Sequence, residues 1–203
     1  RYRLPVAALL ALPAGIGLAR LCAPGLPRAR RAAGIGLALG CSVASLLLSS
    51  RSLEALELAS ALANRAESWR ASHRPELAER DARAAVAIDP SLGKAWYILG
   101  VVLEHEGRTA EAERAYGTAL ERQPGSAEAA ANLAALWLGR GEAEQAIPVL
   151  RRALLERSRD PACWTNLIVA LVQTGRAAEA AAAVHSARAA GVALDPGLIE
   201  AVE

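Results

Sequence analysis

Apolar and small residues recur at a constant interval of 34 positions through the second half of the chain. The interval separates equivalent glycines and equivalent alanines alike: Gly107, Gly141 and Gly175; Ala85, Ala119, Ala153 and Ala187. A fixed period of this size is typical of a solenoid, in which one supersecondary unit stacks on copies of itself. Because such a unit cannot bury its apolar face alone, the pattern predicts repeats packed in series that present an extended surface rather than a closed catalytic pocket.

Each period contains two helical stripes. In residues 93–126, apolar side chains spaced by three, four and seven predict a first helix, which Gly107 ends, and a second helix, which Pro124 ends. The stripes consist of Trp96, Leu99, Gly100 and Leu103, and then of Ala112, Tyr116, Ala119 and Leu120. The small residues would let the two helices approach closely, and the large ones would fill the space between pairs. We expect Trp96, Trp137 and Trp164 to be buried between successive pairs.

This arrangement resembles the tetratricopeptide repeat, whose pattern is W-x2-L-G-x2-L, then A-x3-Y-x2-A, then proline. The resemblance implies an all-α solenoid, and the apolar stretches described below place one or two transmembrane helices before it. Its expected parts are a linker helix and degenerate repeat at 51–92, repeats at 93–126, 127–160 and 161–194, and the start of a capping helix at 195–203. In the degenerate repeat Arg65 stands where leucine is expected, and His73 stands where the turn glycine is expected. Pro148 would bend or weaken its helix if it lies past the first turn.

Two apolar stretches precede the repeats. Residues 32–50 form a run of 19 uncharged residues, the length of a helix that crosses a hydrocarbon core. The stretch over residues 4–26 reaches spanning length if Arg20 extends its charged end toward the interface. These features predict a transmembrane hairpin over residues 1–50, with spans at about 4–26 and 32–50. A signal peptide followed by a single span is the alternative.

Charge divides the chain at the same place. Six of the 23 basic residues and none of the 21 acidic ones lie in residues 1–50, so the remainder is net acidic. The arginines between the two apolar stretches favour a cytoplasmic connector, which would place the repeats on the other side of the membrane. Arg1 and Arg3 oppose that orientation. We therefore expect a protein of the bacterial inner membrane that contacts lipid through its N-terminal spans and has periplasmic repeats.

No motif for catalysis, metal binding or cofactor binding is recognisable. The three histidines lie at no metal-ligand spacing from cysteine or carboxylate, and the three cysteines form no CxxC pair. The acidic repeat region lacks the basic stripe that nucleic-acid binding requires. We expect no catalytic residue, cofactor, nucleic acid or small-molecule substrate, which leaves a protein or peptide as the partner.

The resemblance implies that the first helix of each repeat lines a concave groove. The groove positions that we expect to contact a partner are Lys94, Tyr97, Val101, Glu128, Asn132, Ala135, Asn166, Val169 and Gln173. The lysine and asparagine pair with which some family members hold a peptide carboxylate is missing, so chaperone-tail binding is not expected. Asn132 and Asn166 either pair with the backbone of an extended partner or only satisfy neighbouring helix ends.

Two functions fit these features. The first is a membrane-anchored tetratricopeptide scaffold that mediates protein–protein interaction or complex assembly through the groove. The alternative is the C-terminal part of a polytopic membrane glycosyltransferase with an extracytoplasmic repeat tail, whose catalytic residues would precede Arg1. The chain has no methionine, which favours a fragment or a processed product. The residues before Arg1 would distinguish the two functions.

Overall fold

Helices and short turns make up the part of the chain that the structure describes. The computed structural model describes residues 52–156 and 159–202. The chain divides into two units, residues 1–57 and residues 58–203, and the second unit contains the repeats. Within the described ranges no helix is both long enough and apolar enough to cross a membrane. The predicted spans at 4–26 and 32–50 lie outside these ranges.

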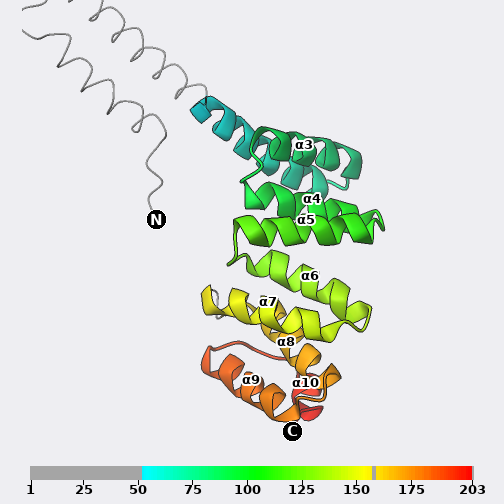
Figure 1. Ribbon diagram of the computed structural model, residues 1–203, viewed down its shortest axis with the longest axis vertical. Coiled ribbons are helices and arrows are strands. Elements are labelled where there is room, and N and C mark those ends of the chain that lie inside the picture. The colour runs from blue at the N-terminus through cyan, green and yellow to red at the C-terminus, as the bar shows by residue number, and fades with distance from the viewer. Residues whose placement is uncertain (1–51, 157–158, 203) are drawn as a thin grey trace, which may run out of the picture. The chain divides into compact units, whose positions relative to one another are not determined.

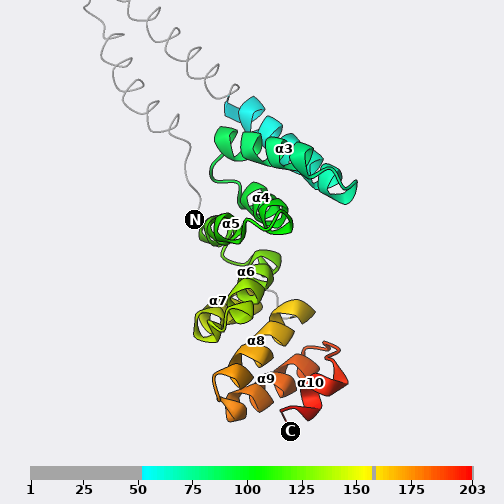
Figure 2. The same cartoon turned by 90° about the vertical axis from the view of Figure 1, so that its right-hand side faces the viewer.

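Each predicted repeat range contains one pair of antiparallel helices, and successive pairs stack in chain order (Figures 1 and 2). A helix over residues 52–71 precedes α3, so the predicted linker and the first helix of the degenerate repeat are continuous. The remaining helices are α3 (Pro75–Ile88), α4 (Gly93–His105), α5 (Thr109–Arg122), α6 (Ala127–Gly139), α7 (Ala143–Glu156), α8 (Pro161–Gln173), α9 (Ala177–Ala189) and α10 (Pro196–Glu200).

Left-handed backbone conformations at the turns explain the glycine period. Gly107, Gly141 and Gly175 have φ values of 76°, 76° and 72°, a region that side chains with a Cβ rarely adopt. His73 occupies the same place in the degenerate repeat with φ 55°, and it is the only non-glycine residue with a positive φ in the described ranges. The prediction that His73 replaces a turn glycine is confirmed.

Local capping fixes where several helices begin. The Ser126 hydroxyl accepts a hydrogen bond from the Ala129 amide at the start of α6. The Asp160 carboxylate accepts from the Cys163 amide at the start of α8, where proline occupies the first turn. Asp195 caps α10 in the same way. An Asp-Pro pair therefore marks the start of α8 and also the start of the predicted capping helix.

Alanine-rich surfaces let the helices approach closely. A Cβ added to Gly100 in α4 would lie 2.6 Å from two ring carbons of Tyr116 in α5, and the tyrosine side chain is fully buried. The core is made largely of alanines of 0% exposure, together with leucine, isoleucine and valine. This packing explains why the repeat requires a small residue at position 100.

The three tryptophans that we expected between helix pairs are half-buried rather than enclosed. Trp96 donates its indole hydrogen to the Pro90 carbonyl at 3.0 Å, and Trp137 donates to the Glu113 carboxylate at 2.8 Å. Trp137 contacts both core clusters of the repeat unit, whereas Trp164 contacts one. Because alanines bring the helices so close, the indole rings lie at the edges of the core.

The degenerate repeat replaces an apolar contact with an ionic one. Arg65 donates to the Asp81 carboxylate at 2.5 and 3.0 Å, and Trp69 donates to it at 3.1 Å. Only 2% of the Asp81 side chain is exposed. Arginine at the leucine position is therefore accommodated by a carboxylate on the partner helix. Pro148 lies inside α7, past its first turn, and the helix continues on both sides of it. The expected bend or weakening of α7 at this proline stays a prediction.

Candidate functional site

The first helices of the three regular repeats form one face of the stack, which we call the first-helix face. It is formed by α4, α6 and α8, and α6 packs directly on α8. Helix α6 carries one charged residue, Glu128, and α8 carries none. Many ion pairs of the regular repeats, in contrast, join an arginine of a turn to a second helix, such as Arg140 with Glu113 of α5 and Arg176 with Glu179 of α9. The first-helix face is thus poor in charge.

At the start of this face, the predicted residues of α4 are linked to their surroundings. Lys94 donates to the Asn64 side-chain oxygen at 2.7 Å, which ties α4 to the helix over residues 52–71. The ring of Tyr97 lies 6.2 Å from that of Tyr116, and burial is the main cause that raises the pKa of Tyr97. Val101 is half-buried beside them. Lys94 is therefore an exposed charge that already has a polar partner.

Asn132 belongs to a chain of hydrogen bonds between two repeats. Its amide donates to the Tyr116 hydroxyl at 3.2 Å, and that hydroxyl donates to the Glu104 carboxylate at 2.6 Å. Burial, together with the Glu104 carboxylate, raises the pKa of Tyr116, so the phenol stays neutral and keeps its hydrogen. Asn132 consequently joins α6 to the preceding repeat.

Asn166 has an equivalent role one repeat later. Its amide donates to the Ala131 carbonyl at 2.9 Å, a hydrogen bond that joins α8 to α6. Both predicted asparagines therefore bond to the neighbouring repeat, but to groups inside its helices rather than to the helix ends of one of the two alternatives. The second alternative, contact with a bound peptide, stays a prediction for the polar atoms that these bonds leave available.

The remaining predicted residues make the rest of the face mainly apolar. Ala135 and Gln173 are exposed, Val169 is half-buried, and Glu128 is exposed at the start of α6. Val172 exposes 42% of its surface nearby. By their spacing, the predicted residues lie on one side of α6 and on one side of α8, and the chemistry of these two sides is apolar with amide groups.

Nothing in the described residues has the geometry of a catalytic or metal centre. No group of three or more histidine, cysteine or acidic side chains could hold a metal ion there. Cys163 is buried, its thiol points to the Ala127 carbonyl at 3.3 Å, and burial raises its pKa to about 12. A thiol that stays protonated in the core is a packing group rather than a nucleophile.

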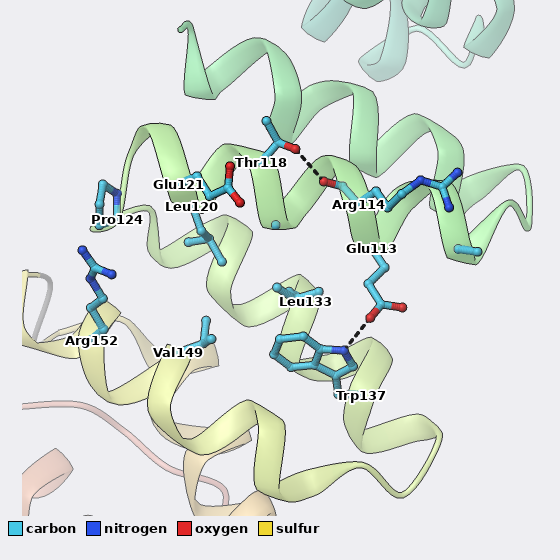
Figure 3. A pocket seen from close by; sticks show the side chains of 12 residues that line it. Glu113, Arg114, Thr118, Leu120, Glu121, Pro124, Leu133, Trp137, Val149 and Arg152 are labelled. Carbon is cyan, nitrogen blue, oxygen red and sulfur yellow. Dashed lines mark hydrogen bonds between the residues drawn. The ribbon is translucent and has the colours of Figure 1, made fainter. Parts of the chain in front are cut away.

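Two further recesses, which the sequence did not predict, lie on the side of the second helices. The α5–α7 groove has a volume of about 800 Å³, and Leu120, Leu133 and Val149 point into it from three different helices (Figure 3). The α7–α9 groove has a volume of about 680 Å³ and lies one repeat further along. Equivalent positions 34 apart line both grooves, for example Leu133 and Leu167.

Family models described as tetratricopeptide repeat match residues 64–126, 103–162 and 138–194. A curated relative, the photosystem I assembly protein Ycf3 of Parasynechococcus marenigrum (strain WH8102), is 34% identical over 87 residues, which is 41% of this chain and 50% of the relative. The chain therefore spans about half the length of that relative.

Two solved structures show the same fold. MamA from Desulfovibrio magneticus RS-1 has a TM-score of 0.54 at 19% identity over 64% of this chain and 73% of that one. YrrB, described as a TPR protein with an unusual peptide-binding site, has a TM-score of 0.58 at 21% identity over 69% and 70%. The helix pairs, their turn glycines and these matches agree, so residues 64–194 of this chain belong to the tetratricopeptide-repeat family.

Proposed function

We propose that this chain is a scaffold that binds a segment of a partner protein on its first-helix face. The observation that carries the proposal is the chemistry of α6 and α8, which contain one charged residue between them and expose Ala135, Val172 and Gln173. An apolar surface with amide groups suits an uncharged segment whose backbone hydrogen-bonds to asparagine and glutamine. The assembly role named for Ycf3 and the peptide site named for YrrB support a binding function.

The test places a charge on this face without disturbing the core. Ala135 is exposed, so Ala135→Glu should leave the helical circular dichroism spectrum unchanged while it weakens partner capture after cross-linking in membranes. Gln145→Glu, on the exposed side of the second helix α7, is the matched control. Equal recovery of partners by both variants would refute binding on the first-helix face.

The two asparagines need a different experiment, because each is bonded to the preceding repeat. Asn132→Ala and Asn166→Ala should lower stability as well as partner capture, since each removes an inter-repeat hydrogen bond of 3.2 or 2.9 Å. Their effect on capture is informative only at a temperature where circular dichroism shows the variants fully folded. Capture unchanged under that condition would assign the asparagines a purely structural role.

We further propose that residues 1–50 anchor the scaffold in a bacterial inner membrane with the repeats in the periplasm. The support is the uncharged run at 32–50 and the arginines between the two apolar stretches. Protease added to intact spheroplasts should degrade the repeats of an anchored chain, and carbonate extraction should leave the chain in the pellet. Repeats that survive protease until the membrane is opened would reverse the orientation. The glycosyltransferase alternative concerns residues before Arg1 and stays a prediction.

A further inference from the structure

The α7–α9 groove is an apolar recess between two second helices. Its floor consists of Trp164, Leu167 and Leu171 from α8, and its walls include Leu154 and Leu155 from α7. The floor residues are spaced by three and four, so they lie on the side of α8 opposite Asn166, Val169 and Gln173. The groove is therefore separate from the first-helix face.

One wall of this groove contains a leucine that buries little of its apolar surface when the chain folds. Leu155 exposes 86% of its surface, more than any other large apolar residue in the described ranges. The equivalent residue of the preceding repeat, 34 positions earlier, is Glu121, which lines the α5–α7 groove. A glutamate is therefore compatible with the repeat at this place. Covering one leucine side chain corresponds to roughly 10- to 100-fold in affinity.

A cation with no partner among the described residues lies beside this apolar recess. Arg152 lines both grooves, and it makes no hydrogen bond or ion pair with the residues that the structure describes. Its neighbour Arg151 differs, because it is bonded across the α7–α9 groove to the Glu179 carboxylate. The groove thus combines an exposed leucine and a half-buried tryptophan with one guanidinium group that is available to a carboxylate.

We propose that the α7–α9 groove is a second docking site, which binds a segment of a partner protein that carries a large apolar side chain next to an acidic residue. The apolar side chain covers Leu155 and enters the recess above Trp164, and the carboxylate pairs with Arg152. Because this site and the first-helix face lie on opposite sides of α8, the scaffold can hold two partner segments at once.

The test uses a random peptide library displayed on phage and selected on the full-length chain, with counter-selection against Leu155→Glu. This variant copies the residue found one repeat earlier and changes an exposed side chain, so it should fold normally, as circular dichroism can check. We expect the selected peptides to carry an aspartate or glutamate within two positions of a large apolar residue. Their affinity should fall at least tenfold on Leu155→Glu and on Arg152→Glu.

Ala135→Glu, on the first-helix face, is the control and should leave the affinity of these peptides unchanged. The proposal is overturned if no selected peptide discriminates against Leu155→Glu, or if the discriminating peptides lack an acidic residue and still bind Arg152→Glu. Sedimentation of the wild-type chain and of Leu155→Glu tests another occupant. Self-association that only Leu155→Glu abolishes would assign the groove to a second copy of the chain and would also overturn the proposal.

Discussion

The contact between Gly100 and Tyr116 allows a sharp test of how closely the helices of one repeat must pack. In Gly100→Ala, the new Cβ would lie 2.6 Å from both Cδ1 and Cε1 of Tyr116. Carbon atoms in favourable contact lie about 3.5–4.0 Å apart, so the ring or the helix must move by about 1 Å. The ring has little freedom to move, since Tyr116 is fully buried and its hydroxyl is bonded to Glu104 and Asn132.

Two opposing effects set the magnitude. Overpacking of a well-packed core destabilises a protein by about 1–3 kcal/mol. Alanine is a better helix former than glycine by about 1 kcal/mol, and this gain acts in the opposite direction. Because the new Cβ of Gly100→Ala meets two ring carbons at once, we take the upper part of the first range. Gly100→Ala should therefore lower the free energy of unfolding by about 1–2 kcal/mol.

Gly117 supplies the matched control, because it lies within the facing helix α5 and an added Cβ would meet nothing within 4 Å. Gly117→Ala should raise the free energy of unfolding by about 0.5–1 kcal/mol, the helix-propensity gain alone. In a Tyr116→Ala background the clash is absent, so Gly100→Ala should also become stabilising. Urea unfolding followed by far-ultraviolet circular dichroism measures all four variants. The reasoning fails if Gly100→Ala stabilises the wild-type chain as much as Gly117→Ala does.

Three further predictions follow from the second helices and their turns. Asp81→Asn should destabilise the chain by about 2 kcal/mol at neutral pH, because it weakens the bonds from Arg65 and Trp69 to a buried carboxylate. The Arg65 guanidinium lowers the pKa of Asp81 in the folded chain. The ionised carboxylate therefore stabilises the fold fully above the unfolded pKa of about 4, and this stabilisation is lost as the pH falls through the folded pKa. The urea midpoints of Asp81→Asn and of the wild-type chain should converge at low pH. His73→Gly should raise the free energy of unfolding by about 1 kcal/mol, because φ 55° suits glycine. The urea midpoint should therefore increase, and a lower midpoint would contradict this account. Pro148→Ala should stabilise α7 by about 1–3 kcal/mol through a restored amide hydrogen, and amide exchange that is no slower in α7 would argue against it.

Much of the fold follows from local rules that a single sequence displays. A turn glycine is needed wherever the backbone turns left-handed between two short helices, so the interval of Gly107, Gly141 and Gly175 marks the turns directly. Proline after an aspartate marks the start of α8 in the same way. Even the irregular His73 could be placed, because its position in the period required the same backbone conformation.

Contacts between helices could not be deduced in this way. Periodicity tells on which side of its own helix a residue lies, but the partner of that residue depends on how far apart two helix axes are. Arg65 was recognisable as an exception in the sequence, whereas its pairing with Asp81 was visible only in the folded chain. The same holds for Asn166, whose amide reaches the Ala131 carbonyl of the preceding repeat.

The amino-acid sequence alone thus determined the repeat length, the turns and the charge-poor character of α6 and α8, because each depends on residues close together in the chain. Only the tertiary structure decided which side chains those helices enclose and which they leave open. In the sequence Leu155 is one more apolar residue of α7, yet the folded chain leaves it 86% exposed beside the α7–α9 groove. Burial is a property of neighbouring helices together, and a linear pattern does not contain the distance between them.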